Sequence, residues 1–224
     1  DMLHISRKLW KYSLESCSLK TIENAILKFT RTSEDVPGWM IPDIYFAFLR
    51  TGDPSGLKVV VYHNAQDIIS LVALFIHVSK LLSGPLSPSV LPVDDLIAIS
   101  RIYWDLGSYE VSQKILNSLL PRTKTTEQRI VINASLGRFF KKIGHSNEAV
   151  QYWQEAAENG DANACIELAM YYEHSVKDCL TALQWCEKGL QAAKNGEKSP
   201  ANSRYLINIQ KRMTRLQFKR SNHV

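Results

Sequence analysis

Residues 57–82 read LKVVVYHNAQDIISLVALFIHVSKLL and join a short polar stretch to a long apolar run. The β-branched residues of 57–63 predict a strand or an extended segment that leads into a helix. Residues 64–82 predict a helix that is apolar almost all round, and a helix of that kind is buried. A charged residue such as Asp67 is costly in a buried helix unless it is paired or binds a metal ion.

His63 and Asp67 are four residues apart, so they lie on the same face of the predicted helix. An imidazole next to a carboxylate can deprotonate a water that a carboxylate-bound metal ion activates. In the alternative interpretation, Asp67 is a first-turn carboxylate that the helix dipole favours, and His63 is a hydrogen-bonded residue at a strand end. The local sequence alone favours this structural interpretation.

The residues before this stretch also predict helices. Residues 1–16 and 19–28 have the spacing of two amphipathic helices, while Pro42 and Gly52 mark the start and the end of a third. The segment SGPLSPSVLPV at 83–93 is rich in proline and serine and cannot continue a helix. We therefore expect a first domain at 1–83, a linker at 84–93 and a second domain at 94–224.

The second domain contains an internal repeat. Segments 111–119, 148–156 and 181–189 predict similar helices, each with a small residue at the same place: Ser112, Ala149 and Ala182. These residues are separated by 149 − 112 = 37 and 182 − 149 = 33 positions, near the ~34-residue period of tetratricopeptide helix pairs. Gly107 and Gly144 are expected to end the helices before the first two segments.

This region resembles tetratricopeptide repeats, with about three degenerate units over 94–194 and a capping helix at 200–219. The alternative is an irregular helical bundle with some internal symmetry. A solenoid of such repeats offers a groove for a peptide or stiffens a neighbouring domain. It therefore allows a protein partner.

Composition excludes several classes of protein. The 224 residues are 45% hydrophobic and 22% charged, which excludes a disordered tail or a fibre. Four cysteines without zinc-ligand spacing favour reduced thiols, and the first residues lack the pattern of a signal peptide. We found no 18-residue apolar run that predicts a membrane span, so we expect a cytoplasmic protein without a membrane partner.

The net charge of +5 is unevenly distributed. From residue 198 to the end there are seven lysines and arginines and no acidic residue, and the central ones are Lys211, Arg212 and Arg215. Such a basic helix can attract nucleic acid. The alternative is a solvated helix C-terminus, where the helix dipole stabilises cations.

A longer stretch suggests a family. DVPGWMIPDIYFAFLRTGD at 35–53, followed by VVVYHNAQDIISLVAL at 59–74, resembles the C-terminal part of a YprB-type ribonuclease H-like domain. The resemblance runs from DMLHISRKLWKYSLESCSLKTIE at the start to about Leu82. Proteins of this family are DEDD 3′→5′ exonucleases, named for four metal-binding acidic residues, and carry a tetratricopeptide region after the nuclease domain.

The resemblance implies roles for four residues. Asp67 matches the last of the four acidic ligands of a Mg²⁺ or Mn²⁺ ion. His63 stands where related exonucleases carry the residue that orients or deprotonates the attacking water, and Tyr62 is the alternative for that role. Asn64 would support the same turn. The implied substrate is a nucleic acid, DNA or RNA.

The strand motifs that carry the first three acidic residues of the family are not in this sequence. One aspartate cannot hold two divalent ions ~3.5–4 Å apart, as two-metal hydrolysis requires. We therefore expect a mainly α chain: the C-terminal fragment of an α/β ribonuclease H-like exonuclease domain, followed by an α-helical tetratricopeptide-like solenoid. We expect little nuclease activity from it alone. The alternative function is a non-catalytic scaffold that binds a protein partner.

Overall fold

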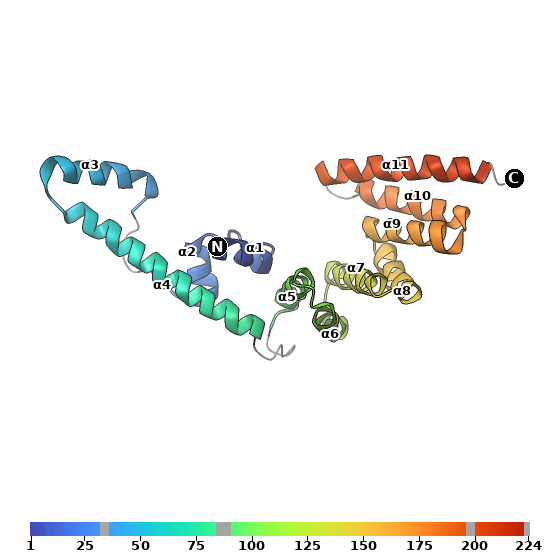
Figure 1. Ribbon diagram of the computed structural model, residues 1–224, viewed down its shortest axis with the longest axis horizontal. Helices are drawn as coiled ribbons and strands as arrows, with labels where there is room; N and C mark the ends of the chain where they lie inside the picture. Colours follow the sequence, from blue (N-terminus) through green and yellow to red (C-terminus); the bar gives the residue numbers. More distant parts are fainter. Residues whose placement is uncertain (32–35, 84–90, 196–199, 222–224) are drawn as a thin grey trace. The chain divides into compact units, whose positions relative to one another are not determined.

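The computed structural model describes residues 1–31, 36–83, 91–195 and 200–221, and all regular elements within these ranges are helical (Figure 1). The expectation of a mainly α chain is confirmed. Residues 84–90 of the expected linker lie outside the described residues.

The chain divides into two compact units, 1–87 and 88–224. The described residues of the first unit form four α-helices and two short helical turns. They are α1 (Met2–Trp10), α2 (Leu19–Ile22), the π-helical turn η1 (Glu23–Leu27), the 3₁₀ turn η2 (Gly38–Met40), α3 (Ile41–Thr51) and α4 (Ser55–Ser83).

Helix α3 has the predicted ends, because Pro42 lies in its first turn and Gly52 follows it with a left-handed φ of 71°. The strand or extended segment predicted at 57–63 is wrong, since these residues form the first turns of α4. The Asp53 carboxylate accepts hydrogen bonds from the Ser55 backbone N–H at 3.0 Å and from its hydroxyl at 2.6 Å. These bonds hold the turn that leads into α4 at Ser55, and the β-branched residues that follow are helical despite their preference for strands.

The expectation that this apolar helix is buried is also wrong. In α4 the buried residues are Ser70, Leu74 and Val78, which form one stripe at a spacing of four residues. The stripe lies on the side of α4 that contacts α1, α2 and η1, where Leu9, Trp10 and Ile22 complete a small core. The described part of this unit supplies too few apolar partners to cover the rest of α4.

Helix α4 also corrects the expectation about membrane spans. It is 29 residues long, and an 18-residue window within it has a mean hydropathy of 1.6. Among the described helices it alone is long and apolar enough, by length and composition, to cross a membrane. The sequence argument missed it because isolated polar residues interrupt the apolar run, although the average over 18 residues stays at 1.6.

The second unit is a succession of helices in which each packs against the next. The α-helices are α5 (Val93–Asp105), α6 (Tyr109–Leu119), α7 (Thr126–Lys142), α8 (Ser146–Glu158), α9 (Ala162–Tyr171), α10 (Cys179–Asn195) and α11 (Pro200–Ser221). Two short turns, η3 (Leu120–Arg122) and η4 (Tyr172–Val176), lie between them. The helices predicted at 111–119, 148–156 and 181–189 are confirmed as parts of α6, α8 and α10.

Glycines turn the chain between paired helices, as predicted. Gly107 and Gly144 have φ of 80° and 83°, and Gly160, which the sequence analysis did not single out, has 98°. These are left-handed conformations in which a side chain is strained. The structure thus repeats one helix–glycine–helix connection three times.

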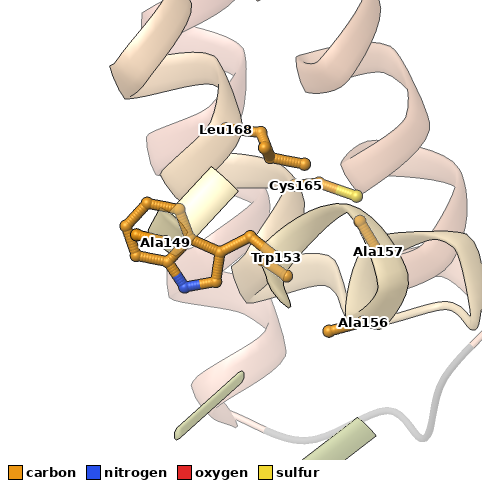
Figure 2. Close-up of a cluster of buried hydrophobic side chains, with 7 residues drawn as sticks. Ala149, Trp153, Ala156, Ala157, Cys165 and Leu168 are labelled. Carbon is orange, nitrogen blue, oxygen red and sulfur yellow. The ribbon is translucent and has the colours of Figure 1, made fainter. Parts of the chain in front are cut away.

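Small residues allow the helices to approach closely. Ser112, Ala149 and Ala182, aligned from the sequence, are all buried. Trp153 lies in the core cluster of α8 and α9, beside Cys165 and Leu168 (Figure 2). A Cβ atom at Gly137 would lie 2.4 Å from Nε1 of Trp153, so α7 can pack here only without a side chain. The assignment of these pairs to tetratricopeptide repeats stays a prediction.

Helix α11 covers the last helix pair. Ile209 and Leu216 are fully buried against Ala182 and Cys186 of α10. The hydroxyl of Tyr205 donates a hydrogen bond to the carbonyl oxygen at the start of α9. This helix occupies the place predicted for the capping helix.

Candidate functional site

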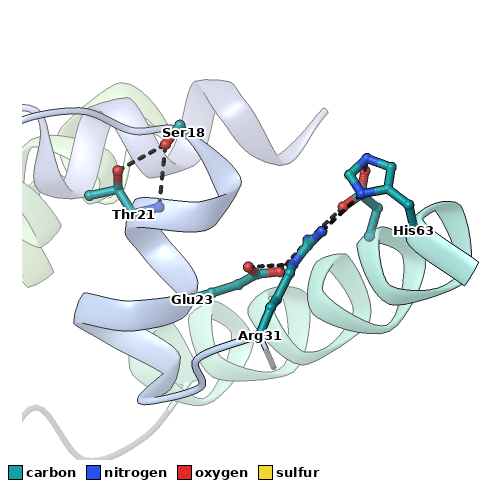
Figure 3. Close-up of polar contacts among 6 residues, drawn as sticks. Ser18, Thr21, Glu23, Arg31 and His63 are labelled. Atoms are coloured by element: carbon teal, nitrogen blue, oxygen red, sulfur yellow. Dashed lines mark hydrogen bonds and ion pairs between the residues drawn. The ribbon is translucent and has the colours of Figure 1, made fainter. Parts of the chain in front are cut away.

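The site begins with a π-helical turn that brings an acidic residue inside the first unit. Ser18 caps α2 by accepting a hydrogen bond from the Thr21 N–H at 3.3 Å (Figure 3). The turn η1 then ends at Lys28, whose left-handed φ is 56°, and the Phe29 N–H bonds the carbonyl oxygen of Glu23 at 2.9 Å. The wider turn directs the Glu23 side chain inward, where 1% of it is exposed. Turns of this kind are rare in proteins as a whole, and those that occur are often found at functional sites.

Arg31 neutralises this buried carboxylate. Its Nε and Nη2 atoms donate to the two oxygens of Glu23 at 2.9 and 2.6 Å, and 8% of its side chain is exposed. The hydrogen bond to Glu23 is the main cause that raises the pKa of Arg31 above its usual value, and the bond to Asp67 adds to it against the effect of burial. Paired in this way, both charges can remain buried.

The same guanidinium group reaches α4. Nη2 of Arg31 lies 2.5 Å from Oδ1 of Asp67, and Nη1 lies 3.3 Å from Nδ1 of His63. Nε2 of His63 in turn lies 3.4 Å from Oδ2 of Asp67. Figure 3 shows Arg31 extended from Glu23 toward His63. His63 and Asp67 are therefore brought together, at the helical spacing that the sequence predicts.

The contact with Arg31 favours one tautomer of a neutral His63 ring. A guanidinium group only donates hydrogen bonds, so Nδ1 of His63 must accept the one from Arg31. The ring proton is then on Nε2, which faces Asp67. Both ring nitrogens thus have protein partners in this arrangement.

The structure corrects the structural interpretation of this stretch. Asp67 is not in a first turn, because α4 begins twelve positions earlier at Ser55, and His63 does not end a strand. Tyr62 is half exposed and Asn64 is exposed, so neither joins the cluster that faces Glu23 and Arg31. Sequence reasoning missed Glu23 and Arg31. Its one available signal was a glutamate directly beside Ile22 in an amphipathic segment.

The basic residues of α11 also have a partner that the sequence analysis did not find. Arg212, Arg215 and Lys219 converge on Glu173 of η4, at 2.6, 2.7 and 2.8 Å. Burial raises the pKa of Glu173, but hydrogen bonds from Lys219 and Arg215 outweigh it and lower the pKa to about 2. Arg212 and Arg215 therefore hold α11 on the unit, while Lys211 is exposed.

The described residues do not fit a divalent metal ion by themselves. Within the described ranges no group of three histidine, cysteine, aspartate or glutamate side chains lies close enough to hold one. Glu23 and Asp67 are joined instead through a single guanidinium. Mg²⁺ and Mn²⁺ need several oxygen ligands, so further carboxylates would be required beside Asp67.

Comparison with known proteins now bears on this site. Residues 1–79, which include Glu23, Arg31, His63 and Asp67, match the sequence model of the RNase_H superfamily. The predicted resemblance to a ribonuclease H-like domain is confirmed for these residues. Over 197 residues the chain is also 34% identical to YprB of Bacillus subtilis (strain 168), across 86% of this chain and 47% of that protein. The chain thus spans about half the length of the curated relative that it matches. No solved structure matches it.

Proposed function

We propose that this chain is the C-terminal portion of a metal-dependent nuclease that removes nucleotides from nucleic acid in the 3′→5′ direction. One observation carries the proposal: the superfamily match covers residues 1–79 and so includes the cluster around Asp67. In the complete domain, the Asp67 carboxylate would hold a Mg²⁺ or Mn²⁺ ion, which supplies the activated water.

The cluster suits this role electrostatically. Glu23 and Asp67 carry two negative charges and Arg31 one positive charge, so with His63 neutral the group keeps a net charge of −2 + 1 = −1. Asp67 is the exposed end of the cluster, with 34% of its side chain accessible. The buried Glu23 anchors Arg31, and Arg31 in turn fixes the orientation of the Asp67 carboxylate. Other acidic groups of the complete domain would then meet a carboxylate that is already oriented.

In the described structure His63 contacts Arg31 and Asp67 and is not free to bind a water. Because its Nε2 proton faces Asp67 and its Nδ1 accepts from Arg31, it orients the carboxylate in the arrangement described. To deprotonate water, as the family resemblance implies, the imidazole must first exchange one of these partners for the water.

The test uses a chimera in which this chain replaces the matching part of B. subtilis YprB. With Mg²⁺ or Mn²⁺ and 5′-labelled single-stranded DNA or RNA, we expect stepwise shortening from the 3′ end. Asp67→Asn should lower the rate by more than the roughly 10- to 100-fold that is typical for loss of a residue that only supports a metal ligand. Asp43→Asn, a change at an exposed carboxylate on α3, should leave the rate unchanged.

Two results would contradict the proposal. One is a folded chimera and a folded YprB that cleave neither DNA nor RNA. The other is an Asp67→Asn chimera that retains the full rate. Robust activity of the 224 residues alone would refute the expectation that the site needs further carboxylates.

The second candidate function, a scaffold that binds a protein partner, is favoured by a groove in the second unit. The groove has a volume of about 560 Å³ and is lined by Arg101, Ala134, Arg138, Glu167 and residues near them. A peptide selected from a library for binding to the full chain should still bind at high salt. It should not bind the Ala134→Arg variant, in which the new side chain would occupy the groove. Selected peptides that bind this variant equally well would count against the groove.

A further inference from the structure

Helix α11 presents a basic side to solvent. It packs on α10 through Ile209 and Leu216, which define its covered side (Figure 1). Lys211 and Phe218 lie nearly opposite to these two residues around the helix, and both are exposed. Positions 205–220 include no acidic residue. In order around the helix, the cations of this basic side are Arg212, Lys219, Arg215 and Lys211.

Glu173 neutralises only part of this charge. Arg212, Arg215 and Lys219 each donate a hydrogen bond to its carboxylate. Three cations thus meet one anion, which leaves a net charge of 3 − 1 = +2. Lys211 is exposed one helical turn from Arg215 and raises the net charge to +3. The basic side therefore attracts a further anion.

The buried carboxylate also fixes where the cations point. The side chain of Glu173 is fully buried in η4, a turn closed by a hydrogen bond from the Asp178 N–H to the carbonyl oxygen of Tyr172 at 2.9 Å. Arg215 donates to Glu173 through Nη2, while 49% of its side chain remains exposed. A guanidinium group carries five N–H donors, so Arg215 keeps donors for a second anion. A side chain that is ordered before binding loses less entropy when the anion binds.

An exposed aromatic ring borders the cations. Phe218 is 67% exposed and lies three positions after Arg215, so the two side chains are neighbours on the helix surface. Lys211 is two turns away on the same side of α11. A nucleobase of any sequence can stack on such a ring while neighbouring cations bind the phosphates of the strand. Bases are accessible for stacking in a single strand and are covered in a duplex.

We propose that the basic side of α11 binds single-stranded nucleic acid, with Lys211 and Arg215 on phosphates and Phe218 against a base. The choice of a nucleic acid rests on the proposed function, because this surface would hold the same substrate on a different unit from Asp67. Lys211 and Lys219 are 219 − 211 = 8 positions apart, which is about 12 Å along a helix. A strand with one phosphate per nucleotide can meet several cations over that length.

A lipid surface fits this side of α11 less well. A helix that lies on a membrane buries a whole apolar face. The exposed large apolar residues among the described side chains of α11 are Ile207 and Phe218. An acidic protein segment would meet the same cations, and competition with a polyanion that has no bases distinguishes it from a nucleic acid.

The experiment measures binding of the 224-residue chain to a 5′-fluorescein-labelled oligothymidylate by fluorescence anisotropy. EDTA is present, so that binding is measured without metal-dependent cleavage. Binding should weaken as salt is added, and Lys211→Gln should make the plot of log K against log salt less steep by about 0.7, the contribution of one phosphate contact on a single strand. Lys114→Gln, at an exposed lysine of α6, is the matched control and should leave the slope unchanged. Both substitutions leave the contacts of Glu173 intact.

Phe218→Ala tests the stacking contact separately. It should weaken binding at least about fivefold without changing the salt slope, because a stacked base adds affinity that does not depend on released ions. Leu106→Ala, at an apolar residue of the second unit that is 71% exposed, is the control and should bind as the unsubstituted chain does. A duplex of the same length should bind more weakly than the single strand.

Four outcomes would overturn the proposal. Two of them are a Lys211→Gln variant with the salt slope of the unsubstituted chain and a Phe218→Ala variant with full affinity. The third is displacement of the strand by polyglutamate as readily as by unlabelled oligothymidylate. The fourth is a chain that binds phosphatidylcholine–phosphatidylglycerol vesicles and not the strand.

The binding measurement and the cleavage assay fail independently of each other. A chain that binds the strand as expected, together with a chimera that cleaves no nucleic acid, would refute the proposed function alone. A chimera that cleaves, together with Lys211→Gln and Phe218→Ala variants that bind as the unsubstituted chain does, would refute the role of α11 alone.

Discussion

Removal of the Arg31 side chain should destabilise the first unit far more than removal of the Asp67 charge. Arg31→Ala leaves the Glu23 carboxylate, of which 1% is exposed, buried without its bidentate partner. Breaking a buried pair in this way costs about 3–5 kcal/mol. Asp67→Asn removes a carboxylate that is 34% exposed and leaves the Arg31–Glu23 pair intact, so we expect a loss of at most about 1 kcal/mol.

Hydrogen exchange measured by mass spectrometry suits this prediction, because it reports each unit of the full chain separately. Peptides of α1 and α4 should lose protection strongly in Arg31→Ala and weakly in Asp67→Asn, while peptides of the second unit should not change. The double variant Glu23→Gln/Arg31→Met should recover part of the loss, because it removes both buried charges together. Equal losses in Arg31→Ala and Asp67→Asn, or no recovery in the double variant, would refute the assignment of Glu23 as the anchor of the site.

Two further predictions concern the second unit. Because the pKa of Glu173 is lowered from 4.5 to about 2 in the folded state, its ion cluster should contribute roughly 3 kcal/mol above pH 4.5 and lose this contribution as the pH falls toward 2. Glu173→Gln should therefore destabilise α11 in urea unfolding at pH 7 and much less at pH 3, and a pH-independent difference would contradict this. Gly137→Ala should cost about 1–3 kcal/mol, because its Cβ would meet the Trp153 ring. Gly38→Ala, with open space around it, is the silent control in the same unfolding series.

The sequence predicts the second unit well because its signals are local. Glycines with left-handed φ end the helices, and small residues such as Ala149 and Ala182 mark where the helices touch. Each signal needs only a few neighbouring residues to be interpreted. The helix positions followed from them.

The first unit was predicted less well because its structure depends on partners and on irregular turns. The β-branched residues 59–61 predicted a strand, but they lie inside α4, which begins at Ser55 directly after the Asp53 turn. Glu23 shares the helical spacing of Leu19 and Ile22, but a glutamate is expected inside only with a partner, and its partner Arg31 lies beyond an irregular turn. The burial of α4 was overestimated because apolar character predicts that a face will be covered but does not supply the covering residues.

The charge pattern of α11 shows the same limitation. A count along the sequence found no acidic residue after position 198, yet Glu173 lies inside the structure against three of the cations. The paired residues are 39 to 46 positions apart. Such a pairing depends on how the helices stack, which local composition does not contain.

The central claim is that Asp67 becomes a metal-binding carboxylate of a nuclease once the remainder of its domain is present. The most direct measurement is the Mn²⁺-dependent rate at which nucleotides leave the 3′ end of a labelled strand. The rate is compared for the chain alone, the chain mixed with the unmatched half of YprB, and the same mixture with Asp67→Asn. We predict cleavage only in the second sample. Equal rates with and without the Asp67 carboxylate, or no cleavage by a stable complex, would contradict the account.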